Sequence, residues 1–269
     1  MAYAFTNGIR LCYERRGRGE PVLLIMGSGA GGRAWTVHQT PALVRSGYQA
    51  ITFDNRGIAP SDAPAGRYSL ADMVADTRGL IESLGIGPCR MIGQSMGALI
   101  VQELAISAPH LVHSAVLMAT KARTDTTRAW YARAFQNLAE KGHHLPPDFA
   151  AMLTAFLMLS PATLDDEESA GLWLESFEQA ENTRRAGPDG QEWADLDADR
   201  RPALRTVTAP CRVIAFADDL VTPPTLGAEV AEAIPDCDLV RIEDAGHFGY
   251  LERPDEVNTA ILEFLRGIR

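Results

Sequence analysis

The stretch Gly93-Gln94-Ser95-Met96-Gly97 constrains this chain more than any other part of its sequence. It follows the apolar run Cys89 to Ile92 and precedes an apolar segment beginning at Ala98, so it joins a predicted strand to a predicted helix. A turn this tight needs glycine on both sides of the serine and forces the serine into a strained backbone. The sequence therefore predicts a nucleophile elbow that exposes the Ser95 hydroxyl at the positive end of a helix.

Strand and helix patterns alternate on both sides of this turn. The predicted strands cover residues 5–13 (a hairpin at Asn7-Gly8), 22–26 (a continuous apolar run), 49–53, 89–92, 111–118, 211–216 and 238–242. The predicted helices cover residues 70–84, with Ser69 and Asp72 as a capping pair, 98–106, 224–233 and 254–267. Such alternation predicts an α/β fold, a mostly parallel sheet of about eight strands with helices on both faces.

The alternation stops between Lys121 and Arg205, where the pattern is helical, amphipathic and rich in aromatic residues. We therefore expect a core domain formed by residues 1–120 and 206–269, with a helical cap of residues 121–205 inserted after the sixth strand. Taken one by one, the aromatic residues of this segment are more typical of a cap interior than of a substrate contact. Some must still face the core, which predicts a roomy apolar pocket.

Composition limits the partners and the location. A formal net charge of −10 argues against nucleic acid or an anionic membrane as a partner. No segment reaches the roughly 18 apolar residues of a membrane span, and no signal-peptide pattern is visible, so we expect a cytoplasmic protein. The excess of arginine over lysine suggests a bacterial source. Monomer and homodimer both remain open.

Cysteine and histidine spacing does not predict a metal site. The four scattered cysteines, Cys12, Cys89, Cys211 and Cys237, are expected to be buried free thiols. The pair His143-His144 lies in a polar stretch without a third ligand at a suitable spacing, so a solvated surface is the favoured interpretation.

A serine hydroxyl becomes a nucleophile only when a base takes its proton and an acid orients that base. Of the six histidines, His247 lies just past the last predicted strand, and it is the candidate base. Asp218 and Asp219 follow the strand of residues 211–216 and are the candidate acids. The carboxyl ends of parallel strands share one edge of a sheet, so these side chains are expected near Ser95.

The order Ser95, Asp219, His247 resembles the nucleophile–acid–base order of the α/β-hydrolase superfamily. The likeness covers nearly the whole chain and is greatest for the cap-bearing serine esterase or thioesterase branch. In that branch the acid usually stands in Asp-x-x-x-Pro, which Asp219 to Pro223 matches, and the histidine commonly follows glycine. The resemblance therefore favours Asp219 over Asp218 as the acid.

The resemblance also implies an oxyanion hole made of two backbone N–H groups, those of Met96 and Ser28. Ser28 follows Met26-Gly27, where the family has His-Gly, so Met26 is a departure from the pattern. A backbone donor survives that change, but the contacts of the missing histidine do not carry over. The segment Asp54-Asn55-Arg56-Gly57 is similar to the family's Asp-x-Arg-Gly turn and is interpreted as structural.

These features predict a serine hydrolase that cleaves an ester, lactone or thioester of a medium-sized apolar molecule through an acyl-enzyme. A bacterial specialised metabolite would fit such a pocket, and the chemistry requires neither a metal nor an organic cofactor. The candidate pocket residues are Gln94, Trp130, Met152, Phe156, Trp173 and Phe248.

Two alternatives use the same pocket. The fold also hosts C–C bond hydrolases, cofactor-free perhydrolases, lyases and cyclases, and it hosts receptors that bind a ligand without turnover. Ser95 disfavours epoxide and haloalkane hydrolysis, since those members of the superfamily carry an aspartate at the elbow.

Overall fold

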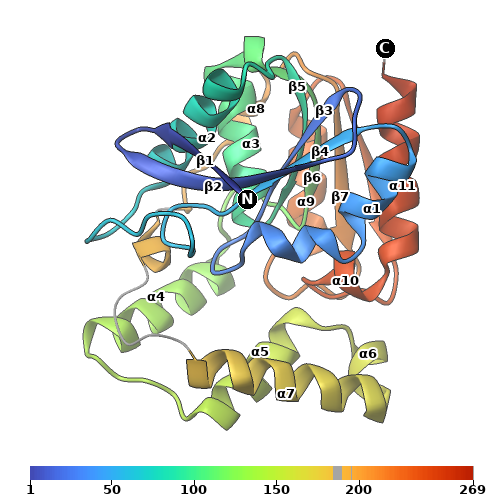
Figure 1. Ribbon diagram of the computed structural model, residues 1–269. Coiled ribbons are helices and arrows are strands. Elements are labelled where there is room, and N and C mark those ends of the chain that lie inside the picture. Colours follow the sequence, from blue (N-terminus) through green and yellow to red (C-terminus); the bar gives the residue numbers. More distant parts are fainter. Residues whose placement is uncertain (184–189, 195, 269) are drawn as a thin grey trace.

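A computed structural model describes residues 1–183, 190–194 and 196–268. Its centre is a sheet of eight strands in the order β1-β2-β4-β3-β5-β6-β7-β8 (Figure 1). The strands are β1 (Ala2–Thr6), β2 (Ile9–Arg16), β3 (Pro21–Ile25), β4 (Gln49–Phe53), β5 (Cys89–Gln94), β6 (Val112–Met118), β7 (Cys211–Phe216) and β8 (Cys237–Ile242). Strand β2 pairs antiparallel with β1 and β4, and all other pairs are parallel. The predicted fold class is confirmed.

Helices cover both faces of the sheet, and a separate cluster of buried apolar residues lies between the helices and the sheet on each face. One face carries α2 (Leu70–Leu84), α3 (Met96–Ser107) and α9 (Pro224–Ala233), and the other carries α1 (Gln39–Arg45) and α11 (Pro254–Gly267). Alternate residues of β3 serve the two clusters: Leu23 packs with the first and Leu24 with the second. A strand buried on both faces must be apolar throughout, which explains its continuous apolar run.

Local features predicted from the sequence can be checked residue by residue in the structure. Asn7 and Gly8 both have positive φ, as the tight β1–β2 hairpin requires. Ser69 and Asp72 form the predicted capping box of α2. All four cysteines are free thiols, although Cys237 is partly exposed where burial was expected. Helix α1 was not predicted, because its seven residues include polar side chains that only the tertiary fold buries.

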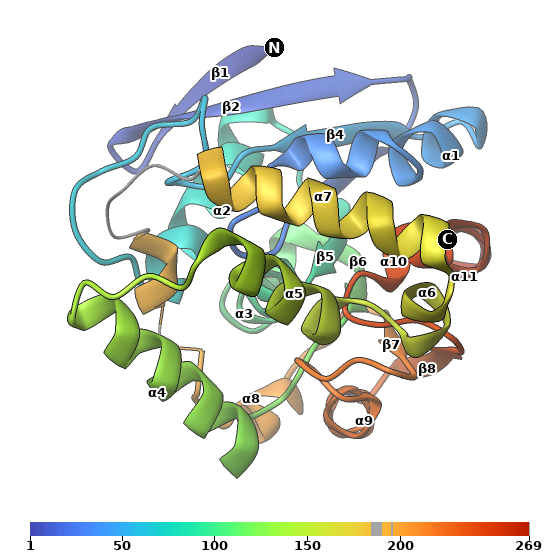
Figure 2. The same ribbon diagram turned by 90° about the horizontal axis from the view of Figure 1, so that it is seen from below.

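Between β6 and β7 the chain leaves the sheet and forms the segment that we call the insert, residues 121–205. Its elements are α4 (Thr126–Glu140), α5 (Pro147–Met158), α6 (Pro161–Asp165), α7 (Glu167–Thr183), the 3₁₀ turns of Gly190–Trp193, and α8 (Arg201–Leu204). Figure 1 shows α4 to α7 beyond the lower edge of the sheet, and Figure 2 shows α5 and α7 side by side across that edge. The division into two domains stays a prediction. Among the described helices, none has the length and apolar character needed to cross a lipid bilayer.

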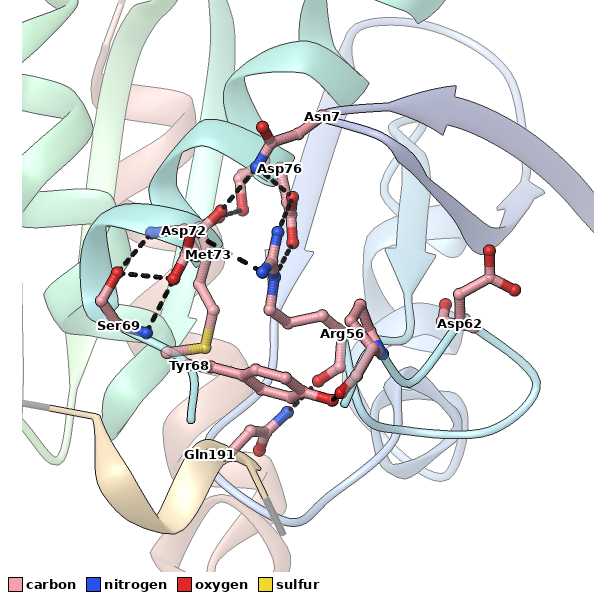
Figure 3. Close-up of polar contacts among 12 residues, drawn as sticks. Asn7, Arg56, Asp62, Tyr68, Ser69, Asp72, Met73, Asp76 and Gln191 are labelled. Carbon is pink, nitrogen blue, oxygen red and sulfur yellow. Dashed lines mark hydrogen bonds and ion pairs between the residues drawn. The ribbon is translucent and has the colours of Figure 1, made fainter. Parts of the chain in front are cut away.

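A buried ion pair joins the turn after β4 to the middle of α2 (Figure 3). The Arg56 Nε and Nη2 atoms donate to the two carboxylate oxygens of Asp76 at 2.6 and 2.7 Å. Asn7 donates to the same carboxylate at 2.9 Å. Only 8% of the Arg56 side chain and 2% of the Asp76 side chain are exposed. This network ties the hairpin, the turn and α2 together.

Removing Asp76 takes away the two short hydrogen bonds of the buried Arg56 guanidinium and leaves it only the half-exposed Asp72 carboxylate at 3.7 Å. We expect Asp76→Ala to lower the free energy of unfolding by about 3–5 kcal/mol. Glu82→Ala is the matched control, since Glu82 lies on the same helix in a half-exposed pair with Arg78 at 2.8 Å. Its cost should stay below about 0.5 kcal/mol. Urea unfolding followed by circular dichroism measures both, and equal costs would contradict this account.

Candidate active site

Ser95 lies between β5 and α3 with φ 54° and ψ −120°, a conformation that L residues rarely adopt. A Cβ atom at Gly97 would lie 2.1 Å from the carbonyl oxygen of Ile25, so the first turn of α3 rests directly on the end of β3. The Ser95 N–H donates to the Met118 carbonyl of β6 at 3.0 Å. Contacts from two neighbouring strands thus hold the strained serine in place.

His247 connects Ser95 to an aspartate. Its Nε2 atom lies 3.0 Å from Ser95 Oγ, and its Nδ1 atom lies 2.8 Å from Asp219 Oδ2. The loop after β8 supplies His247 and the loop after β7 supplies Asp219. With Nδ1–H donated to the carboxylate, Nε2 is left as an acceptor for the Ser95 hydroxyl. Only 4% of His247 and 2% of Asp219 are exposed.

Three further donors fix the Asp219 carboxylate. The N–H groups of Val221 and Thr222 both donate to Oδ1 at 2.8 Å, and the Thr222 hydroxyl donates to Oδ2 at 2.7 Å. Of the two adjacent aspartates, Asp219 is therefore the one that contacts His247. Asp218 uses its N–H to bond the Ala245 carbonyl, and burial with nearby carboxylates raises the pKa of its side chain.

The two predicted oxyanion donors come from neighbouring residues in space. The Ser28 hydroxyl lies 3.1 Å from the Met96 sulfur, so the loop after β3 touches the first turn of α3. An N–H in the first turn of a helix has no acceptor within its own helix, which leaves that of Met96 for a ligand. Met26, in place of the family's histidine, is buried, and its carbonyl accepts a hydrogen bond from Asn55 at 3.0 Å.

Hydrogen bonds from two other segments hold the glycine-rich loop 27–32. Asp54 accepts from the Gly32 N–H at 2.8 Å, so the turn after β4 holds one end of the loop. Gln191, from the end of the insert, accepts from the Gly29 N–H at 2.9 Å and donates to the Arg56 carbonyl at 2.7 Å (Figure 3). The insert therefore takes part in shaping the loop that carries Ser28.

Aromatic rings gather next to His247. Trp173 and Phe177 of α7 lie with ring centroids 6.1 Å from that of Phe248, and 5.4 Å from each other. The Phe248 ring in turn lies 6.3 Å from the imidazole of His247. All three aromatic side chains are partly exposed. The structure thus brings the predicted pocket residues Trp173 and Phe248 together and adds Phe177.

The other predicted pocket residues lie elsewhere. Gln94 is only 2% exposed, and its amide donates to the His247 carbonyl at 3.3 Å. It therefore contacts the backbone of the loop that carries His247. Trp130 is 64% exposed on α4, where the Arg133 guanidinium lies 3.9 Å over its ring. Met152 and Phe156 are exposed on α5, by 40% and 56%. Their roles as pocket residues stay predictions.

Sequence reasoning missed four residues of this region: Thr222, Phe177, Gln191 and Glu252. Thr222 had a local signal, because an aspartate often accepts hydrogen bonds from N–H groups two and three residues further on. Nothing local singled out the other three, because the contact of Phe177 with Phe248 and the hydrogen bonds of Gln191 to Gly29 and of Glu252 to Ser160 join residues far apart in the sequence. Over the described residues, no group of three or more histidine, cysteine or acidic side chains is arranged to hold a metal ion.

Fold, elbow and side-chain order agree with one class of protein. Residues 20–254 match the family described as alpha/beta hydrolase fold. The chain belongs to this family, which confirms the resemblance seen in its sequence.

Particular relatives cover almost the full chain. A Mycobacterium tuberculosis protein provisionally named non-heme bromoperoxidase BpoC is 45% identical over 261 residues, 97% of this chain and 99% of the relative. Its crystal structure superposes with a TM-score of 0.90, covering 96% of both chains at 44% identity. 3-Oxoadipate enol-lactonase 2 of Acinetobacter baylyi is 30% identical over 253 residues, 94% of this chain and 92% of the relative. A thermophilic esterase of Thermogutta terrifontis has a TM-score of 0.84 at 27% identity, covering 99% of this chain and 98% of the esterase.

The close contact of α3 with β3 leaves no room for a side chain at Gly97. Gly97→Ala would press a methyl group against the Ile25 carbonyl, and we expect it to cost about 1–3 kcal/mol or more of unfolding free energy. Gly171→Ala in α7 is the control, because its Cβ would meet nothing within 4 Å. There the better helix propensity of alanine should stabilise the chain by up to about 1 kcal/mol. Urea midpoints that shift in the same direction for both variants would refute this reasoning.

Proposed function

We propose that this chain is a serine hydrolase that cleaves an ester, lactone or thioester of a medium-sized apolar molecule. One observation carries the proposal. His247 bridges Ser95 and Asp219 through its two ring nitrogens at 3.0 and 2.8 Å. This is the arrangement in which a neutral imidazole takes the serine proton while a carboxylate stabilises the imidazolium that forms.

The reaction would proceed in two steps through an acyl-enzyme. Ser95 Oγ attacks the carbonyl carbon while His247 Nε2 takes its proton, and the same proton then passes to the leaving alcohol or thiol. Water, deprotonated by His247, then releases the acid and regenerates Ser95. In both steps the N–H groups of Met96 and Ser28 would stabilise the charged oxygen, an effect worth roughly 3–4 kcal/mol per donor in comparable enzymes. The scheme uses neither a metal nor an organic cofactor.

The substrate is proposed to be apolar because of the rings around His247. Trp173, Phe177 and Phe248 offer a partly exposed aromatic surface that reaches His247 through Phe248. We propose that the insert is a cap over this surface, and its position across the edge of the sheet supports that role (Figure 2). The names of two relatives, an enol-lactonase and an esterase, support ester and lactone chemistry.

Labelling with a fluorophosphonate probe tests the proposal most directly. The wild type should be labelled at Ser95 and should hydrolyse p-nitrophenyl esters, with a preference for acyl chains longer than acetyl. Ser95→Ala should abolish labelling and lower kcat roughly a million-fold, because the nucleophile is absent. His247→Ala should also prevent labelling, since Ser95 then has no base.

Ser107→Ala is the matched control, because Ser107 lies at the far end of α3 with an exposed hydroxyl. It should leave both labelling and turnover unchanged. A folded wild type that neither reacts with the probe nor hydrolyses any ester, lactone or thioester would refute the proposal. A protein that binds a ligand at this site without turnover would then be the better description.

The bromoperoxidase name of the relative at 45% identity favours a second candidate, perhydrolysis without a cofactor. Hydrogen peroxide would replace water at the acyl-enzyme, and its proton would pass to His247. The Ser95 ester bond would break and release a peroxycarboxylic acid. Such an acid oxidises bromide: peracid, bromide and a proton give the carboxylic acid and hypobromous acid.

This candidate predicts bromination of phenol red in acetate buffer with hydrogen peroxide and bromide. The rate should depend on acetate, because the acyl group comes from the buffer, and should vanish in Ser95→Ala. Replacing acetate by a phosphate buffer at the same pH is the control. Bromination that persists without a carboxylate, or none at all, would refute perhydrolysis while leaving the hydrolase proposal in place.

A further inference from the structure

The carboxylate of Glu252 joins the His247 loop to the insert. Glu252 is the last residue of α10 (Gly249–Glu252), which begins two residues after His247. Its Oε2 atom accepts the Gly246 N–H at 2.7 Å, directly before His247. Its Oε1 atom lies 2.8 Å from both the N and the Oγ of Ser160 and 2.7 Å from the Thr163 hydroxyl. One side chain therefore contacts both segments.

Two other contacts join the His247 loop to the insert. The N–H of Phe248 donates to the Met158 carbonyl, the last residue of α5, at 2.9 Å. A Cβ atom at Gly246 would lie 2.5 Å from the Leu159 carbonyl carbon, so the backbones touch where α5 passes into α6. Ser160 is fully buried and His247 nearly so. The backbone on both sides of His247 thus rests on the junction between α5 and α6.

We propose that Glu252 is a positioning residue that makes the His247 loop and the α5–α6 junction of the insert move as one unit. The proposal rests on the role of His247 as the base in the proposed function. If the two segments separate, the Gly246 peptide is free to turn, and Nε2 leaves its position 3.0 Å from Ser95 Oγ. The insert then controls the base as well as the apolar surface.

A carboxylate suits this position because every neighbour that it contacts is a donor. Gly246 and Ser160 offer N–H groups, and Ser160 and Thr163 offer hydroxyls. A glutamine in this place would have one accepting oxygen, and its NH₂ group would face an N–H group that cannot accept, either that of Gly246 or that of Ser160. Glu252→Gln therefore keeps the shape of the side chain but loses the hydrogen bond to one of these two N–H groups.

The test compares Glu252→Gln and Thr163→Val with the wild type, using p-nitrophenyl butyrate turnover and amide hydrogen exchange of residues 158–164 and 244–250. Glu252→Gln should lower kcat about 10- to 100-fold with little change in KM, because the base is misplaced while the apolar surface is kept. Exchange should rise in both segments together. Thr163→Val removes a donor on the insert side only and should give a smaller loss of kcat in the same direction.

Glu256→Gln removes the same charge from the exposed first turn of α11 and should change neither turnover nor exchange in these segments. A kcat that stays at the wild-type value in Glu252→Gln, or exchange that rises in one segment alone, would overturn the proposal. So would an equal loss in Glu256→Gln. If Glu252→Gln fails to fold, Thr163→Val carries the same comparison.

Hydrogen exchange separates this proposal from the proposed function, since it needs no substrate. A wild type without hydrolase activity, whose Glu252→Gln variant still exchanges faster in both segments, would refute the hydrolase and support the coupling. An active wild type with unchanged exchange and kcat in Glu252→Gln would support the hydrolase and overturn the coupling.

Discussion

The contact between the first turn of α3 and the end of β3 is the constraint on which the candidate site depends. Backbone touches backbone at Gly97 and Ile25, so Ser95 has no room to relax from its positive φ. Because β5, β6, β7 and β8 are parallel, the loops that follow β7 and β8 open at the same edge as Ser95. The sheet thus brings Asp219 and His247 within hydrogen-bond distance of residues far away in the sequence.

Much of this arrangement could be predicted because each element has a local cause. A continuous apolar run marked β3, the Asn7-Gly8 turn marked the β1–β2 hairpin, and the caps of α2 gave its bounds. Ser95, Asp219 and His247 could be placed because each directly follows a strand of a parallel sheet. Helix α1 escaped prediction, since tertiary burial of Gln39 and Thr40 overrides their polarity.

The pocket was harder to predict than the polar site. Apolar periodicity shows that a helix has a buried face, but not whether that face meets the sheet, another helix or a ligand. Trp130 and Trp173 look alike in the sequence, yet one lies exposed on α4 and the other against Phe248. Gln191 and Glu252 act through hydrogen bonds across more than 90 residues of sequence, which no local pattern encodes.

Helix α4 differs from the helices that cover the sheet in how little of it is buried. None of its residues is buried, and Trp130, Tyr131 and Phe135 are all exposed. Substitutions at exposed positions away from buried networks usually change stability by less than about 0.5 kcal/mol. Substitutions at the exposed positions of α4 are therefore nearly neutral for folding, whereas those at Gly97 or Asp76 are not. Arg128 is different, because it donates to the Leu220 carbonyl at 2.8 Å and so joins α4 to the loop after β7. The exposed positions of α4 can therefore change without loss of the fold that carries Ser95, Asp219 and His247.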